Sequence, residues 1–384
     1  MSRNTILSIA LVIIAYIVSA EISYALFSQK SKTLSTPRPS SETDKLSFDD
    51  NLPKTEECPL NGALYSKKQK EWWEKHRPLG VMVENHEEAR PQSGLGSSDV
   101  IYEAVAEGAI TRFLAVFYCQ NTTLVGPVRS ARTYFLDWIS EYGDSPLYAH
   151  VGGANTPGPA NALGQIEDYG WVSYNDLSQF SLGYPTFKKI DRPNGRDVAT
   201  EHTVFSSLEE LWKTATKRKL TNVDKDGKSW DEEFVKYSFK DDAKETERGK
   251  DQLIQLEFWK DYKQYAIDWT YDPKSNLYKR INAGVPHTDR NNKEQLTAKT
   301  VIVLTMTETH AFDGYQDNIH LLYKNKGVGK VRIFMDGKEI LGTWKKDTRT
   351  SRTLIFNSSG EEVKFNRGTL WFEILPTTGV VNVS

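Results

Sequence analysis

The chain has 384 residues, of which 38% are hydrophobic and 26% are charged, and these proportions are typical of a globular protein. Its formal net charge of −2 at pH 7 gives no general attraction to nucleic acid or to an anionic bilayer, so nucleic acid is not an expected partner. The chain without its N-terminal region, about 325 residues, is long enough for two domains of ordinary size.

The N-terminus carries an apolar segment, because residues 4–20 contain no charged side chain. A membrane anchor needs about 20 mainly apolar residues, and residues 6–27 reach that length by including Glu21. A cleaved signal peptide ends in small residues, and residues 18–20 (Val-Ser-Ala) fit that description. We predict that residues 1–28 are a single transmembrane anchor at the cell membrane, with a signal peptide and a secreted protein as the alternative. Both place the remaining chain outside the cytoplasm.

Residues 29–57 are rich in Ser, Thr, Pro and Asp and cannot bury enough apolar surface to fold, so they are expected to form a disordered tether. Cys58 and Cys119 are the two cysteines of the sequence. An oxidising compartment would let them pair, which would attach the start of the first domain to a strand end. Two unrelated thiols are the alternative.

The fold is expected to be α+β, with an N-terminal mixed α/β sandwich-like domain over residues 58–218 followed by a β-rich C-terminal domain over residues 251–384. The highly charged residues 219–250 are expected to form the junction. Apolar and β-branched runs predict strands over residues 79–83, 100–105 and 113–119 of the first domain, and apolar spacing predicts a helix from Arg129 to Tyr142. Alternating runs with hairpin turns predict the second domain. Because those hairpins are local in sequence, we expect this domain to fold without the first.

Charged residues interrupt the apolar strand-like runs of the first domain, and a buried charge is costly unless it is paired or used. The candidate catalytic residues are therefore Glu84, Glu103, Glu107 and His150. A desolvated glutamate can act as a general acid or base. The alternatives are that the glutamates pair with arginines for structure, and that His150 is a hydrogen-bonded core histidine.

Arg129 and Arg132 follow a Gly-Pro-Val segment and are predicted to open a helix, where two arginines three residues apart can bind a carboxylate or phosphate. We expect them to face a pocket edged by Glu84 or Asn85, so the ligand-binding candidates are Arg129, Arg132, Asn85 and Arg112. Structural pairing of the two arginines with acidic residues of the same domain is the alternative.

No metal or cofactor is expected from the pattern of residues. The segment from Asn222 to Glu233 matches the spacing of a calcium-binding EF-hand loop except at its first position. The segment that follows alternates like a strand where an EF-hand requires a helix, so a charged hairpin turn is the better interpretation.

Four motifs of the first half, VMVENHEEARPQSGL, DVIYEAVAEGAITRF, GPVRSARTYF and HVGG, resemble the YerB-like family of bacterial envelope proteins, often lipoproteins, which carries a domain of unknown function. In the second half the resemblance rests on residues 278–280, residues 287–289 and VGKVRIFMDGKEILGTW. It covers nearly all of residues 75–376. The resemblance implies an N-terminal α+β domain and a β-rich C-terminal one, and it assigns no activity. The chain lacks the cysteine to which a lipid is attached in lipoproteins, which favours a transmembrane helix.

Two classes of function follow. The first is a membrane-anchored extracytoplasmic protein that binds or regulates without catalysis and recognises an anionic cell-wall polymer or an envelope protein. The second is a glycan hydrolase or transferase with Glu84 and Glu103 or Glu107 as paired carboxylates, which in glycosidases lie about 5–9.5 Å apart. Carboxylates bound to Arg112, Arg129 or Arg132 would favour the first class or a purely structural role.

Overall fold

The computed structural model describes residues 48, 49 and 51–384, which form one compact unit. The predicted anchor and most of the predicted tether lie outside the described residues. Within the described part, none of the helices combines the length and the apolarity that crossing a bilayer requires.

A mixed ten-stranded sheet runs through the molecule in the order β21-β20-β19-β16-β23-β4-β5-β3-β6-β7. Five of its strands come from the first half of the chain: β3 (Leu79–Glu84), β4 (Val100–Glu107), β5 (Ile110–Phe117), β6 (Leu147–His150) and β7 (Asp176–Ser178). The other five come from the second half: β16 (Thr300–Met306), β19 (Gly327–Met335), β20 (Lys338–Lys346), β21 (Leu354–Asn357) and β23 (Leu370–Pro376). The two sets meet where β23 pairs with β4 in parallel.

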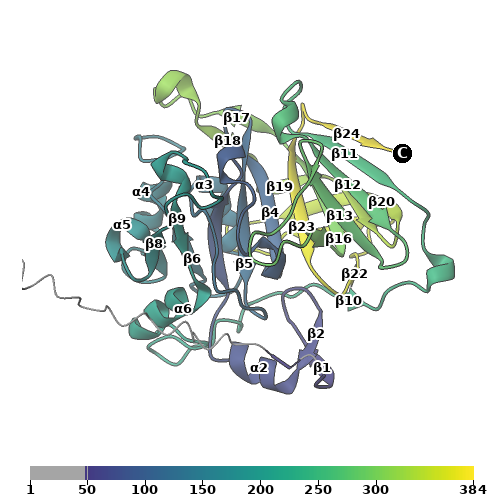
Figure 1. Ribbon diagram of the computed structural model, residues 1–384, viewed down its shortest axis with the longest axis horizontal. Helices are drawn as coiled ribbons and strands as arrows, with labels where there is room; N and C mark the ends of the chain where they lie inside the picture. Colours follow the sequence, from purple (N-terminus) through teal and green to yellow (C-terminus); the bar gives the residue numbers. More distant parts are fainter. Residues whose placement is uncertain (1–47, 50) are drawn as a thin grey trace, which may run out of the picture. The chain divides into compact units, whose positions relative to one another are not determined.

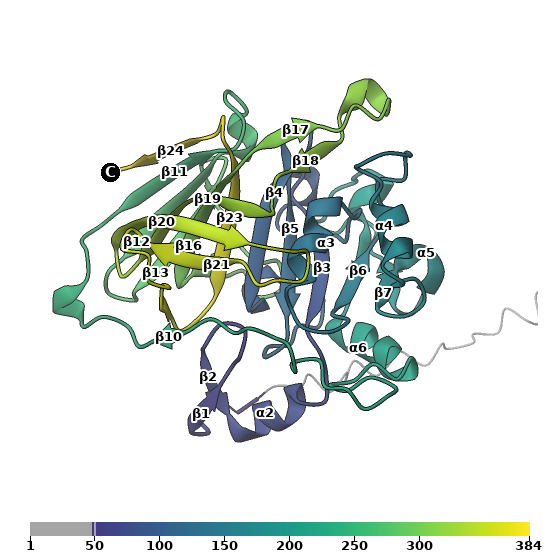
Figure 2. The same ribbon diagram turned by 180° about the vertical axis from the view of Figure 1, so that it is seen from behind.

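A second sheet packs beside the end of the large sheet that the second half supplies (Figure 1). Its strands are β11 (Leu253–Glu257), β12 (Ile267–Asp272), β13 (Leu277–Asn282), β14 (Val285–Pro286), β15 (Thr297–Ala298) and β24 (Val380–Val383). The helices α4 (Ala162–Asp168), α5 (Gln179–Leu182) and α6 (Leu208–Lys217) gather at the opposite end, near β6 and β7 (Figure 2). The remaining elements are short: α2 (Lys67–Trp73), α3 (Thr133–Ile139), β1 (Lys54–Glu57), β2 (Leu64–Ser66), β8 (Phe187–Lys189), β9 (Val204–Ser206), β10 (Phe239–Lys240), β17 (Glu308–His310), β18 (Leu321–Tyr323), β22 (Phe365–Asn366) and six 3-10 turns, η1 (Glu87–Ala89), η2 (Leu95–Ser97), η3 (Thr200–His202), η4 (Glu245–Glu247), η5 (Lys263–Tyr265) and η6 (Gln316–Asn318).

Both faces of the large sheet are covered, which explains why β3 is buried along its whole length and reads as an almost continuous apolar run. One face packs on the fully buried helix α3, through Tyr134 and Trp138. The other face packs on α6 and on the second sheet, through Trp212 and Trp269. Each of these two core clusters contains residues from both halves of the chain. The expected α+β fold with a β-rich second half is confirmed.

The pairing of β23 gives no support to the expectation that the second half folds by itself. Its strand β23 is hydrogen-bonded on one side to β16 and on the other to β4 of the first half. A fragment that starts near residue 250 would therefore expose a central strand and half of two cores. Hairpin patterns reveal only local pairings, so they could not show this one. The domain boundaries drawn from composition stay a prediction.

Two open points about the first half are resolved. Cys58 and Cys119 form a disulfide, which attaches the start of the folded unit to the end of β5. Asp224 accepts backbone hydrogen bonds from Asp226 and Lys228, so the segment with EF-hand spacing is a hairpin turn, as interpreted.

Candidate functional site

The charged residues inside the strand-like runs are buried or, in the case of Glu107, half-buried, and all of them have partners. Glu84 and Arg112 lie directly opposite each other on β3 and β5, on the face of the large sheet that α3 covers. A bulge in β4 after Val105 turns Glu107 to this same face, where it bonds Arg112 and Arg132. Glu103 instead bonds Thr111, the neighbour of Arg112, and therefore lies on the opposite face. One cluster therefore holds Glu84 and Glu107, and Glu103 belongs to another.

Three arginines surround the two carboxylates of the first cluster. Arg129 Nε donates to Glu84 Oε1 at 3.0 Å, and its side chain is 24% exposed. Arg132 Nη2 bonds Glu107 Oε2, and Arg112 Nη2 lies 3.5 Å from Glu107 Oε1. The second oxygen of Glu84 accepts from His202 Nδ1 at 2.7 Å. The arginines thus outnumber the carboxylates, and the cluster carries a net positive charge.

Arg129 and Arg132 do not open a helix, contrary to the prediction. Helix α3 begins at Thr133, and Arg132 precedes it in an extended conformation. The N–H of Arg129 donates to Met82 on β3, and its carbonyl accepts from Val151. These strand-like bonds hold residues 129–131 extended. The apolar spacing that predicted the helix begins only after them, so it could not locate the start.

A cavity of about 210 Å³ lies beside this cluster, and Arg129, Ser130, Arg132 and Glu107 line one side of it. The other side comes from the loop after β6 and from the segment between β17 and β18, and it includes Asn155, Tyr315 and His320. We call this cavity the arginine pocket. Both arginines line it, as predicted. Its acidic edge is Glu107, and neither Glu84 nor Asn85 is among its lining residues.

The arginines determine the protonation of the carboxylates. Burial raises the pKa of Glu107, but Arg132 and Arg112 outweigh burial and bring the pKa to about 2. Burial alone would raise the pKa of Glu84, but the hydrogen bond from His202 and the charge of Arg129 lower it below its ordinary value. Burial, with Arg132 next, lowers the pKa of Arg112 to about 10. Burial opposes protonation of His202, but the hydrogen bond and the charge of Glu84 raise the pKa of this imidazole above its ordinary value.

Asn85 and Glu103 belong to a separate buried network. The side-chain amide of Asn85 donates to Thr111 at 2.7 Å and to Glu103 at 3.3 Å. Glu103 forms an ion pair with Arg280 of β13, and neither side chain has any exposed surface. Glu373 of β23 lies opposite Glu103. Burial and the charge of Glu103 raise the pKa of Glu373 well above its ordinary value, which favours the neutral carboxyl.

His150 is also a buried scaffold residue. Its Nε2 lies 2.6 Å from Asp176 Oδ1, and its Nδ1 lies 2.6 Å from the carbonyl oxygen of Gly152. Both ring nitrogens are occupied, and 1% of the residue is exposed. It therefore has no nitrogen available to a substrate.

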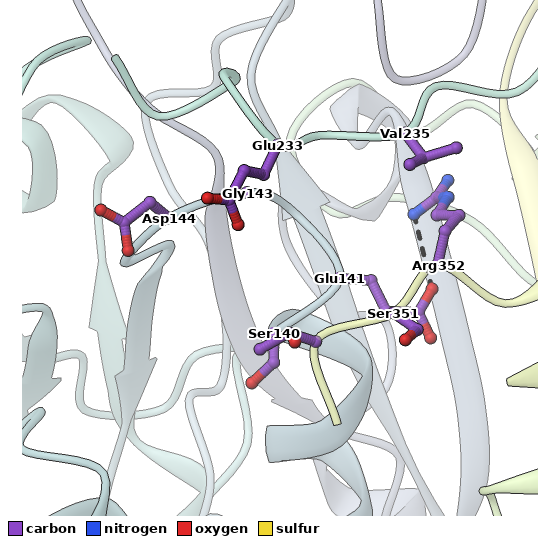
Figure 3. Close-up of a pocket in the computed structure, with 9 residues that line it drawn as sticks. Ser140, Glu141, Gly143, Asp144, Glu233, Val235, Ser351 and Arg352 are labelled. Carbon is purple, nitrogen blue, oxygen red and sulfur yellow. Dashed lines mark ion pairs between the residues drawn. The ribbon is translucent and has the colours of Figure 1, made fainter. Parts of the chain in front are cut away.

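A larger cavity of about 280 Å³ lies at the end of α3 (Figure 3). Glu141, Asp144 and Glu233 line it, with Arg352 as its cation. Arg352 is paired with Glu141 at 3.6 Å and lies over the ring of Tyr237 at 4.0 Å. The acidic lining makes this cavity a poor anion site, so the arginine pocket is the better candidate.

Sequence reasoning missed several residues of these clusters, namely His202, Arg280, Glu373, Tyr315 and His320. Arg280 lies in a motif that carried the family resemblance, and this was the only signal for it. His202 is a lone histidine before a short strand, and Tyr315 and His320 lie in a loop, so no periodic pattern indicated them.

The depressed pKa of Glu107 predicts acid sensitivity. The unfolded carboxyl titrates near its ordinary value of 4.5, so the stabilisation is fully present above that pH and is lost as pH falls towards about 2. This difference between the unfolded and folded pKa values of Glu107 corresponds to about 3 kcal/mol in the free energy of unfolding. Urea unfolding at pH 7, 4.5 and 3 should show the larger part of this loss in the wild type, because pH 3 still lies above the folded pKa of about 2. The loss should be smaller in Glu107→Gln, which cannot titrate. Equal losses in both proteins would contradict the prediction, and Glu339→Gln, in an exposed pair with Arg332, is the control.

Comparison with known proteins identifies the family. The N-terminal domain model of the protein family of unknown function DUF3048 matches residues 63–221, and its C-terminal domain model matches residues 254–372. A protein of Bacillus subtilis (strain 168) named "Putative lipoprotein YerB" is 29% identical over 328 residues, which cover 85% of this chain and 88% of that protein. The crystal structure of YerB from Bacillus subtilis superposes with a TM-score of 0.69 at 24% identity, over 85% of this chain and 100% of that one, and so has the same fold. The chain belongs to the DUF3048 family of YerB-like proteins.

Proposed function

We propose that this protein is a membrane-anchored extracytoplasmic protein that binds an anionic polymer of the cell envelope through the arginine pocket. The observation that carries the proposal is the excess of arginine over carboxylate around a cavity that Arg129 and Arg132 line. Guanidinium groups bind carboxylates and phosphates through paired, charge-assisted hydrogen bonds.

The size of the pocket favours a polymer over a free small molecule. Pockets for drug-sized ligands usually measure about 300–1,000 Å³, and the arginine pocket measures about 210 Å³. A single phosphate or carboxylate group fits that space. A polymer can place one such group in the pocket while its chain continues over the surface, so a repeating anion fits best.

The bonding of the carboxylates weighs against the glycan hydrolase. Glu84 and Glu103 lie on opposite faces of the large sheet, so they cannot act on one substrate. Glu84 and Glu107 share a face, but arginines bind both and lower the pKa of each. A general acid needs a raised pKa instead. These groups therefore suit binding better than proton transfer.

Two observations support the location. The relative from Bacillus subtilis carries the word lipoprotein in its name, and the disulfide is of a kind that persists in oxidising compartments. Both cysteines of the sequence are used in that disulfide, which leaves no free thiol for a lipid. We therefore propose that residues 1–28 attach the protein to the membrane.

We expect Arg129 to contribute more to the binding of the polymer than to the folding stability of the protein. In Arg129→Ala, Glu84 keeps its bond to His202, so the thermal midpoint should change little. Loss of one charge-assisted contact, about 1.5–3 kcal/mol, should weaken binding about 10- to 100-fold. Titration of the full-length protein in detergent with polyglycerol phosphate, at two salt concentrations, measures the effect.

The matched control is Arg332→Ala, because Arg332 also pairs with a glutamate and its side chain is 28% exposed. This variant should bind like the wild type. Equal weakening in both variants would mean unspecific attraction, and a large drop in the midpoint of Arg129→Ala would make Arg129 a scaffold residue. Either outcome contradicts the proposal.

The location has its own test. Protease added to cells stripped of their wall should digest the folded unit, because residues 57–384 are expected outside the cytoplasm. Complete protection would overturn the topology. Release of a protein that starts at Glu21 would overturn only the anchor and would leave a secreted protein.

A further inference from the structure

A second group of side chains lies next to Glu84, outside the arginine pocket. It consists of His86, Glu88 and His202, and we call it the histidine cluster. One nitrogen or oxygen from each residue lies within 4.8 Å of the others. The two imidazole rings stack with their centroids 4.8 Å apart and their planes 8° apart. His202 Nε2 lies 3.3 Å from Glu88 Oε2.

Glu84 orients this cluster. Its Oε2 lies 2.7 Å from His202 Nδ1, and this contact directs the other ring nitrogen, Nε2, towards Glu88. Metal-bound histidines commonly have this arrangement, in which a carboxylate binds the nitrogen that does not bind the metal.

We propose that His86, Glu88 and His202 bind one divalent transition metal ion of the Zn²⁺ type, with Glu84 as the carboxylate that orients His202. Two imidazoles and one carboxylate are ligands that Zn²⁺ uses in proteins, and three protein ligands leave a fourth coordination position open. The proposal rests on this geometry alone and does not depend on polymer binding by the arginine pocket.

The cluster can close around an ion. Ligand atoms of a tetrahedral zinc site lie about 3.3 Å apart, given zinc–ligand distances of about 2.0 Å, so the 4.8 Å span must contract. Glu88 can adjust, because its side chain is 46% exposed and the bond that its Oε2 accepts from the N–H of Ala199 is long, at 3.4 Å. His86 Nδ1 accepts only one long bond of 3.3 Å, from the N–H of Glu88. The ligands lie in or beside two short turns, η1 and η3, which can adjust more easily than a strand.

Metal titration tests the proposal. The full-length protein in detergent is stripped with a chelator, dialysed and titrated with ZnCl₂ by calorimetry, and Co²⁺ absorption reports the coordination geometry. We expect about one equivalent of Zn²⁺ and a tetrahedral Co²⁺ spectrum. His86→Ala and Glu88→Gln should each raise Kd by at least about tenfold, with an unchanged fold by circular dichroism.

The matched control is Glu87→Gln, which removes the same charge from the neighbouring residue and leaves all three ligands in place. It should keep the wild-type Kd within about threefold. No saturable Zn²⁺ binding, an unchanged Kd in both ligand variants, or equal weakening by Glu87→Gln would each overturn the proposal. Arg129→Ala should keep Zn²⁺ binding, so failure of polymer binding can be told apart from failure of this site.

Discussion

The buried ion pair between Glu103 and Arg280 joins the two halves of this protein. Neither side chain is exposed, so both ions have lost their hydration, and only good geometry and further bonds can compensate for that loss. Thr111 and Asn85 bond Glu103. The guanidinium of Arg280 lies over the rings of Phe113, Trp269 and Trp371, at 4.9 Å from the centroid of the last. Removal of either partner would leave an uncompensated charge in the core.

This pair also holds the strand that carries the candidate site. Glu103 anchors the middle of β4 against the second sheet, and Glu107 at the end of the same strand holds Arg112 and Arg132. The bulge between these glutamates directs one into the core between the sheets and the other towards the arginine pocket. One face of β4 therefore carries the buried pair that joins the halves, and the other face carries the glutamate that lines the arginine pocket. The second half of the chain contributes Tyr315 and His320 to that pocket, so the pocket is complete only when the halves are joined.

The sequence predicted local features well and long-range ones poorly. Apolar runs located β3, β4 and β5 because each strand is buried on both faces, and interrupting charges located Glu84 and Glu107 because a buried charge needs a partner. The sequence did not identify Arg280 as the partner of Glu103, since 177 positions separate them and no local pattern encodes such a pairing. The parallel contact between β23 and β4 was missed for the same reason. The bulge in β4 places Glu103 and Glu107 on opposite faces of the sheet. The alternation of apolar and polar residues along the sequence does not reveal this bulge.

The central claim is that the two halves form one cooperative unit held by the Glu103–Arg280 pair. Scanning calorimetry of the full-length protein and of Arg280→Met tests it most directly. The account predicts one unfolding transition in the wild type. It also predicts one transition in the variant, with the whole unit destabilised by about 3–5 kcal/mol because Glu103 is left buried without its partner. Two separate transitions in the wild type, or a variant that unfolds at the wild-type temperature, would contradict it.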